Sequence, residues 1–318
     1  MLQYLIILLS DDSTSFCHYP VPTTSTGLMP IETLRQGIRF GMMENMMIQF
    51  IYPAKPLPEA YQSLIETTDH YKIVPQETAD ELTDIVVVSG WSFEKAISLG
   101  KSTTLRTTKD DLFTHYTLLP TLLQAVPNVN VVITDMETFT DKDFATYRKV
   151  TNSLAETLKV MIINGQKPNL NLLTDRMALQ QMNNCNAGQA SITLAPNGHL
   201  YICPAFYYDN PSQHVGEPHS NSIHIVNQQL YGISHAPICN HCDAFQCKRC
   251  VWLNKKITLE VNTPSHEQCV VAHIERNTSA RLLTAIRQHA TFLPEQEDIM
   301  ETTFLDPFDN RDKWQQEN

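Results

Sequence analysis

Seven cysteines in the second half of the chain have the spacing of metal ligands. Four of them form the run Cys239-x2-Cys242-x4-Cys247-x2-Cys250. Thiolates at C-x2-C spacing can hold one ion or cluster from a single tight turn. Packing does not account for four cysteines within so short a segment, so we interpret the region as a metal-binding module. The full set is Cys185, Cys203, Cys239, Cys242, Cys247, Cys250 and Cys269.

Seven sulfurs divide naturally into four and three. Four complete the shell of one zinc ion or one [4Fe–4S] cluster, and three hold a cubane with one iron open to a further ligand. Two [4Fe–4S] clusters would therefore use every thiolate. The alternative is structural zinc that stabilises a module with a small hydrophobic core. Because zinc prefers complete sets of four, one zinc site would need a histidine, and His241, His266 or His214 could serve.

The cysteine order resembles the SPASM domain, the cluster-binding extension of radical SAM peptide-modifying enzymes. Its pattern is C-x9-15-G-x4-C, a gap, C-x2-C-x5-C-x3-C, a second gap and C. This chain matches it with Gly198 between the first two cysteines, and two internal spacings are each one residue short. The resemblance implies one auxiliary cluster on Cys239, Cys242, Cys247 and Cys269. It implies a second auxiliary cluster on Cys185, Cys203 and Cys250.

The segment after the first expected strand departs from the radical SAM pattern. Those enzymes carry C-x3-C-x2-C there, whereas this chain keeps only Cys17, with Ser10 and Thr14 at the first two ligand positions. Hydroxyls are poor ligands for iron–sulfur clusters. The second strand should end in Gly-Gly-Glu to receive the amino group of S-adenosylmethionine, and residues 50–53 lack it. We therefore expect no S-adenosylmethionine cleavage by this chain alone.

Residues 8–19 and 47–53 are similar to the family named CXXX repeat peptide maturase, a SPASM-containing group from Bacteroidales. The resemblance covers nearly the entire chain and implies a ribosomally made precursor peptide with cysteine at every fourth residue. We expect an auxiliary-cluster protein that binds this peptide or relays electrons, working beside a competent radical SAM enzyme. A zinc-stabilised peptide-binding scaffold and an enzyme with an unrecognised S-adenosylmethionine site remain alternatives, so whether the chain is itself an enzyme stays open.

The elements that must position these residues alternate along the first half of the chain. Expected strands are 4–10, 48–52, 84–89, 103–107, 130–134 and 169–173, and expected helices are 30–45, 58–67, 92–99, 109–125 and 142–164. The pattern predicts an α/β fold with a partial (β/α)6 radical SAM-like barrel followed by a small cysteine-rich SPASM-like module. An open doubly wound sheet fits the same periodicity. The expected domains are 1–178, 179–290 and an acidic tail, 291–318.

Several local features complete the expectations. Asn197-Gly198 between alternating apolar residues predicts a hairpin turn. Residues 207–222 are expected to form a loop, residues 279–289 a closing helix, and Asp141 the cap of the long helix before the module. A carboxylate pair at Asp135 and Glu137, or Asp175 beside Arg176, could serve chemistry, although solvated loop carboxylates are commoner. Cys17 could be a remnant, a reactive thiol or an extra cluster ligand, and His18 an acid, a base or a structural residue.

The amino-acid composition disfavours two classes of binding partner. Acidic side chains outnumber basic ones by 34 to 23 and the net charge is -11, which disfavours nucleic acid and anionic membranes. The apolar run 4–9 is too short to span a bilayer, and no glycine-rich phosphate loop follows a strand. We expect a cytoplasmic protein with reduced thiols. The methionines Met42, Met43, Met46 and Met47 could face a peptide partner or pack a helix on the sheet.

Overall fold

A computed structural model describes residues 2–20, 27–182, 184–218 and 223–299. The chain forms two compact units. We call the first the sheet unit; it comprises Met1–Thr108, Thr121–Thr134 and Asn186–Gly232. We call the second the cysteine unit; it comprises Lys109–Pro120, Asp135–Cys185 and Ile233–Asn318. The predicted tail from residue 300 onward, and residues 219–222 of the predicted loop, lie outside the described residues.

The sheet unit is built on one eight-stranded sheet with the order β6-β5-β4-β3-β2-β1-β7-β8. The strands are β1 (Tyr4–Leu8), β2 (Met47–Ile51), β3 (His70–Pro75), β4 (Ile85–Ser89), β5 (Ser102–Thr107), β6 (Val129–Ile133), β7 (Ser191–Leu194) and β8 (Leu200–Tyr201). All neighbours pair in parallel except β7 and β8. The first six strands follow one another in order, and β7 returns to pair with the other side of β1. This strand order fits both a partial barrel and an open doubly wound sheet. A curved, barrel-like closure stays a prediction.

One predicted strand is wrong and one strand was missed. Residues 169–173 form a turn that leads into α7 (Thr174–Ala178), where the Thr174 hydroxyl donates to the Leu170 carbonyl at 3.0 Å. The alternating apolar residues of this segment lie in the turn, and the segment forms no strand of the sheet. The missed strand, β3, carries polar residues at its start and a proline at its end, which weaken the strand pattern.

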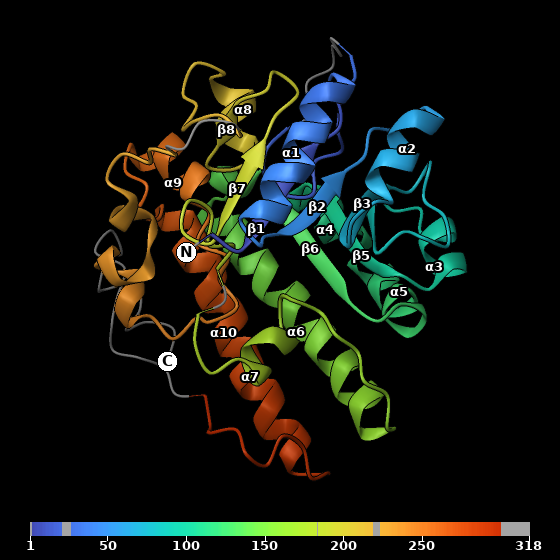
Figure 1. Ribbon diagram of the computed structural model, residues 1–318. Helices are drawn as coiled ribbons and strands as arrows, with labels where there is room; N and C mark the ends of the chain where they lie inside the picture. The colour runs from blue at the N-terminus through green and yellow to red at the C-terminus, as the bar shows by residue number, and fades with distance from the viewer. Residues whose placement is uncertain (1, 21–26, 183, 219–222, 300–318) are drawn as a thin grey trace. The chain divides into compact units, whose positions relative to one another are not determined.

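The two faces of the sheet bury different sets of side chains. Leu5, Ile7 and Leu9 of the β1 segment pack on α1 (Ile31–Met43) and α2 (Glu59–Ile65), which lie across one face in Figure 1. Ile6 and Leu8 point to the other face, as the period of two in a strand requires. There they pack in a cluster that includes Tyr201 and the partly buried Phe16, Tyr207 and Tyr208.

Short elements complete the sheet unit. They are α3 (Glu94–Leu99), α8 (Pro204–Asp209) and η3 (Gln228–Tyr231). The predicted helix at 109–125 is divided into α4 (Lys109–His115), η1 (Tyr116–Leu118) and α5 (Leu119–Ala125). The predicted hairpin is confirmed, because β7 and β8 pair in antiparallel fashion around a turn in which Gly198 has φ 86. Within the described residues 207–218, the predicted loop differs at its start, because α8 extends to Asp209.

The cysteine unit is dominated by α6 (Asp141–Ile163) and α10 (His266–Arg287), which lie side by side in Figure 1. Its other elements are α7, α9 (Val251–Thr258), η2 (Met136–Thr138), η4 (Ile233–His235) and η5 (Cys239–His241). Thr140, not the predicted Asp141, caps α6: its side chain accepts from the Asp143 N–H while Asp143 accepts in return from the Thr140 N–H. Within the described part of the chain, no helix has the length and hydropathy to cross a membrane.

Candidate functional site

In the sheet unit, the segment after β1 is fixed by hydrogen bonds from its hydroxyl groups. Ser10 is 2% exposed, and its hydroxyl donates to Asp12 and to the Gly27 carbonyl at 3.0 Å. The Ser13 hydroxyl donates to the Ile51 carbonyl at the end of β2 at 2.8 Å. The Thr14 N–H reaches the carbonyl of Tyr52 at 2.9 Å. The serine at the first predicted ligand position is thus a structural residue that ties the segment together.

Cys17 lies in the same segment and is half-buried. Arg106, in β5, donates from Nε to the Cys17 carbonyl at 3.0 Å and from Nη2 to the Tyr19 carbonyl at 2.9 Å. His18 Nδ1 lies 3.0 Å from the carbonyl of Ile133 at the end of β6. Because a carbonyl only accepts, Nδ1 carries the proton, and His18 has the structural role that the sequence left as one option. Residues of β5 and β6 therefore hold the segment from Cys17 to Tyr19.

Tyrosines gather on the inner face beside this segment. The rings of Tyr19 and Tyr208 stack with centroids 5.4 Å apart, and the Tyr207 hydroxyl donates to Asp11. Burial raises the pKa of Tyr19 well above its usual value, and the nearby Tyr208, Cys17 and Cys203 raise that pKa further. Cys203 sits at the N-terminal cap of α8, in the sheet unit. The structure therefore brings Cys203 and Cys17 to one aromatic cluster, which sequence reasoning missed.

The other six predicted ligands belong to the cysteine unit. Cys239 begins η5, and its carbonyl accepts from the Cys242 N–H at 3.2 Å in the tight turn expected of C-x2-C. Cys247 follows in the next turn, and Cys250 is the buried cap of α9. Cys269 lies in the first turn of α10. Cys185 is exposed, and its N–H donates to the Lys248 carbonyl at 3.4 Å, beside the central cysteine turn.

The central thiols influence one another electrostatically. Burial, followed by the negative charges of Cys239 and Cys242, raises the pKa of Cys247 to about 12. Burial also raises the pKa of Cys242. A bound cation would favour the thiolate forms and so lower both pKa values, because thiol ligands lose their protons on metal binding. As a donor set, these buried and half-buried thiols have the chemistry of zinc or iron–sulfur ligands.

The thiols do not already form a coordination shell. Across residues 2–20, 27–182, 184–218 and 223–299, no three His, Cys, Asp or Glu side chains are placed as a metal site requires. The assignment of seven cysteines to two centres stays a prediction.

A buried polar network surrounds Cys242. His273, in α10, places Nε2 3.6 Å from Cys242 Sγ, and burial, with the neighbouring Arg276, lowers its pKa to about 4. Arg276 is 1% exposed and pairs with Asp243, whose second oxygen lies 3.7 Å from Arg176. Sequence reasoning singled out Cys242 and Arg176 but missed His273, Arg276 and Asp243. A lone histidine on a helix gives no spacing signal, and only the folded structure brings it to a cysteine.

Two of the three histidines proposed as zinc ligands lie in the cysteine unit, and the third lies in the sheet unit. His241 is exposed in η5. His266 begins α10 and packs its ring against Phe144. His214 belongs to the sheet unit, where its ring stacks on His199 with centroids 4.2 Å apart.

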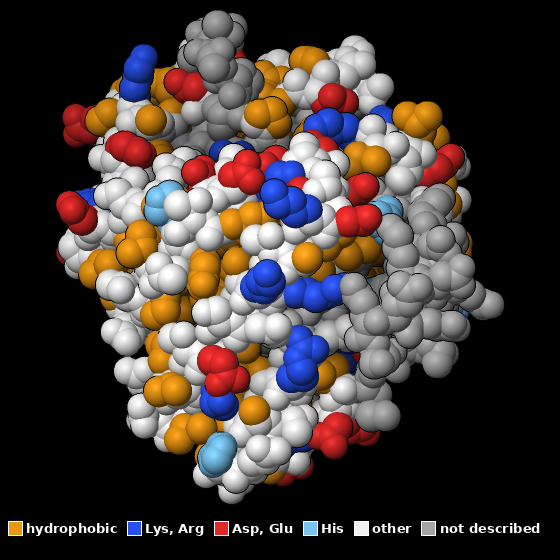
Figure 2. Space-filling model, turned by 180° about the vertical axis from the view of Figure 1, so that it is seen from behind, with side chains coloured by type: hydrophobic (Ala, Val, Ile, Leu, Met, Phe, Trp, Pro, Cys, Tyr) orange, Lys and Arg blue, Asp and Glu red, His pale blue; other side chains and the backbone are white. Residues whose placement is uncertain are grey.

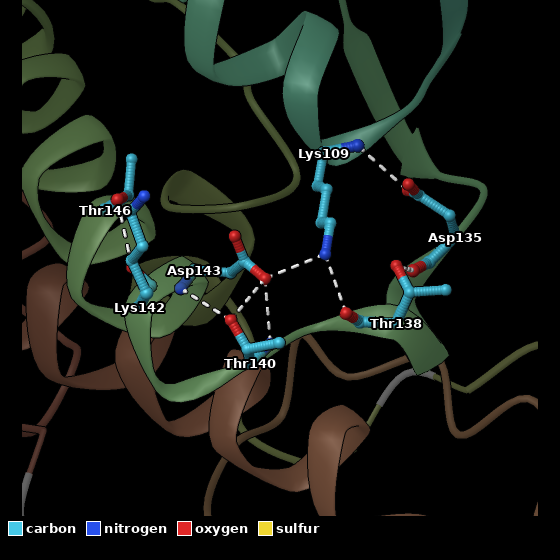
Figure 3. Close-up of polar contacts among 7 residues, drawn as sticks. All are labelled: Lys109, Asp135, Thr138, Thr140, Lys142, Asp143 and Thr146. Atoms are coloured by element: carbon cyan, nitrogen blue, oxygen red, sulfur yellow. Dashed lines mark hydrogen bonds and ion pairs between the residues drawn. The ribbon is translucent and has the colours of Figure 1, made fainter.

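The carboxylates considered for catalysis have structural partners in the cysteine unit. Asp135 accepts from the Lys109 N–H at 2.8 Å at the start of α4, and Glu137 pairs with Lys256 at 2.8 Å. Figure 3 shows the Lys109 ammonium group between the Thr138 carbonyl and Asp143, at 2.6 and 2.8 Å. Similarly, Asp175 lies 3.6 Å from Lys248. These contacts fix the ends of helices, and they do not form a pair of carboxylates open to a substrate.

On the face drawn in Figure 2, Lys and Arg side chains are interspersed with acidic and apolar ones. Among the described residues visible there, they form no continuous basic field.

The fold matches that of the protein anSMEcpe. A structure of anSMEcpe with bound AdoMet aligns with a TM-score of 0.64 and 14% identity, over 91% of this chain and 96% of that chain. Native anSMEcpe with bound AdoMet and Cp18Cys peptide gives 0.62 and 15%, over 90% and 99%. Streptococcus suis SuiB bound to S-adenosylmethionine is a weaker match, with a TM-score of 0.46 and 12% identity over 84% and 77%. Neither a protein-family model nor a curated protein matches the sequence.

A TM-score of 0.64 over most of both chains establishes a shared fold, and at 14% identity it establishes the fold alone. The predicted resemblance is therefore confirmed at the level of fold. The chain is a mixed α/β protein with a mostly parallel, eight-stranded sheet.

Proposed function

We propose that this protein acts in the maturation of a ribosomally synthesised cysteine-repeat precursor peptide, as an auxiliary-cluster protein of the cytoplasm that lacks an S-adenosylmethionine cluster of its own. It binds the peptide or relays electrons beside a competent radical SAM enzyme. The observation that carries the proposal is the segment after β1, which has the hydroxyl of Ser10 where a cluster ligand is expected.

Two features of that segment support the proposal that the chain lacks an S-adenosylmethionine cluster of its own. The Ser10 hydroxyl is buried and donates to a backbone carbonyl, which leaves it unsuited to bind iron. Cys17 is the only cysteine in residues 10–19, and one thiolate does not hold a cubane. Arg106 donates to the backbone carbonyls of Cys17 and Tyr19, so contacts within the sheet unit hold this segment.

The seven expected ligands support the auxiliary centres; six of them belong to the cysteine unit and Cys203 belongs to the sheet unit. Cys239, Cys242, Cys247 and Cys269 would hold one [4Fe–4S] cluster, and Cys185, Cys203 and Cys250 would hold a second with one iron open to an outside ligand. Such clusters supply one-electron chemistry and, where an iron is open, a place for a peptide thiolate. His273 stands beside Cys242, and burial keeps it neutral at pH 7, so its ring can donate an N–H to sulfur.

The shared fold supports the proposal that the partner of this protein is a peptide. The anSMEcpe chain that matches this one over most of its length was solved with bound AdoMet and a peptide. A zinc-stabilised peptide-binding scaffold is the second candidate. It is favoured by the tight C-x2-C turn at Cys239 and Cys242, which zinc ribbons share.

The proposal is tested with anaerobically purified protein, reduced with dithionite and given S-adenosylmethionine. We expect no 5′-deoxyadenosine above the level of a protein-free control. A synthetic peptide with cysteine at every fourth residue should bind, and its serine counterpart should bind about tenfold more weakly if an open iron takes a thiolate. Release of 5′-deoxyadenosine by the natural chain, lost in Cys17→Ala, would overturn the proposal.

A further inference from the structure

A hollow of about 840 Å³ opens at one edge of the sheet unit. Its lining includes Tyr4, Met47 and His70, which are the first residues of β1, β2 and β3, and Asp84 just before β4. Because these strands are parallel, their amino ends share one edge of the sheet. Met42, near the end of α1, forms part of the wall. In size the hollow falls within the range of sites that hold small ligands or a few side chains.

Large apolar side chains are exposed in and beside this hollow. Met42 is 58% exposed, Met47 45% and Tyr71 44%, and the adjoining Met43 is 72% exposed. Of the four methionines Met42, Met43, Met46 and Met47, only Met46 is buried. Packing on the sheet therefore explains Met46 and does not explain the other three, which are exposed. Scattered single apolar residues are ordinary on a surface, but a group around a concave site indicates a binding surface. Thioethers also adapt to ligands of irregular shape.

The charge of the lining is one-sided. Asp69 and Asp84 line the hollow, and no Lys or Arg is among its described lining residues. The Asp84 carboxylate accepts from the Lys72 N–H at 2.8 Å with one oxygen, which leaves lone pairs on the other. The His70 ring places Nδ1 2.7 Å from the Thr68 carbonyl, so Nε2 is an acceptor. An occupant that complements these groups carries positive charge and N–H donors beside large apolar side chains.

We propose that this hollow binds a segment of the precursor peptide in which Lys or Arg stands next to large apolar residues. The inference rests on the proposed function for the identity of the peptide. Residues 295–318 of this chain are less suited to the site, because that segment is rich in Asp and Glu and would be repelled by Asp69 and Asp84.

The hollow lies at the opposite edge of the sheet from the segment that contains Cys17. The segment with Cys17, and Arg106, lie at the carboxyl ends of the strands, and the hollow lies at the amino ends. A five-residue strand separates the two edges by about 17 Å at about 3.3 Å per residue. A peptide held in the hollow would therefore lie at the edge of the sheet opposite that segment.

The test uses two fluorescent fifteen-residue peptides of matched apolar residues, one with Lys at its charged positions and the other with Glu, and measures anisotropy with the purified full chain. We expect the Lys peptide to bind and the Glu peptide to bind at least about tenfold more weakly, with affinity for the Lys peptide falling in high salt. Met42→Ser with Met47→Ser should weaken binding about fivefold or more, and Asp69→Asn should reduce the salt dependence. Val226→Ser, at a residue 66% exposed outside the hollow, is the matched control.

Equal binding of the two peptides, or equal binding by the methionine variants and the control, would overturn the inference. So would a gain in binding on deletion of residues 300–318, which would assign the hollow to the chain's own end. A dimer in sedimentation that is lost in the methionine variants would assign it to a second copy. The measurement needs neither a cluster nor S-adenosylmethionine, so its failure would leave the proposed function standing.

Discussion

Nε2 of His273 lies 3.6 Å from Sγ of Cys242. Burial lowers the pKa of His273 to about 4, so the ring is neutral at pH 7, and with its proton on Nε2 it donates to sulfur. An N–H bond to a cluster sulfur stabilises the reduced, more negative form. We therefore expect His273→Leu to make the midpoint potential of the cluster more negative, measured by redox titration with electron paramagnetic resonance. His273→Gln keeps an N–H donor and should restore part of the shift; identical potentials in all three proteins would contradict this role.

The buried carboxyl group of Glu275 makes the stability of the folded chain depend on pH. It is buried in α10, where it accepts from the Tyr147 hydroxyl at 2.6 Å and from Gln246 Nε2 at 3.2 Å. Burial raises its pKa from 4.5 to about 7. The folded chain therefore holds a proton that the unfolded chain releases, so stability is full below pH 4.5 and falls as pH rises to about 7.

We expect Glu275→Gln to remove that dependence. Urea unfolding at pH 5 and pH 8 should show the free energy of unfolding of the variant improving relative to the natural chain by about 2 to 3 kcal/mol at the higher pH. Tyr147→Phe keeps the carboxyl group and is the control, since it should retain the loss at high pH. A difference between Glu275→Gln and the natural chain that is the same at both pH values would argue against a buried titrating carboxyl group.

The buried pair of Arg276 and Asp243 supports the cysteine turn. Arg276→Met would leave Asp243 with only Arg176, 3.7 Å away, as its cationic partner. Removing one member of a buried pair is costly, so we expect a loss of about 3 kcal/mol in urea unfolding, partly recovered by adding Asp243→Asn. Arg35→Met breaks an exposed pair with Glu32 and should cost less than about 1 kcal/mol. Equal effects of the two arginine variants would refute the argument.

Arg106 holds the backbone around Cys17. Arg106→Gln removes the fork of donors that reaches the carbonyls of Cys17 and Tyr19, and two lost hydrogen bonds amount to about 1 to 3 kcal/mol. Local opening should become easier, so alkylation of Cys17 by iodoacetamide should accelerate about tenfold, followed by mass spectrometry of the peptide that contains it. Arg39→Gln, an exposed change on α1, should leave the rate as it was. An unchanged rate in Arg106→Gln would show that other contacts fix the segment.

The elements with strong periodicity could be predicted from the sequence. Apolar β-branched runs located β1, β2, β4, β5 and β6, and Asn197-Gly198 located the hairpin between β7 and β8. The predicted closing helix at 279–289 captured only the end of α10, which begins at His266. The first turns of this helix bury polar residues such as Gln268 and His273, so apolar periodicity does not reveal them.

The candidate site was only partly visible in the sequence. Spacing alone indicated the turn of Cys239 and Cys242, because C-x2-C is a local motif. The contact of His273 with Cys242 joins residues 31 positions apart, and the contact of Arg106 with Cys17 joins residues 89 apart. Single polar residues at such separations have no pattern to mark them, and only tertiary structure places them together.

The metal content of the anaerobically purified full chain tests the central claim most directly. We expect about eight iron atoms and matching sulfide for two [4Fe–4S] clusters, unchanged by Cys17→Ala and reduced by about half in Cys242→Ala. A colourless protein that contains zinc and no iron would contradict the account.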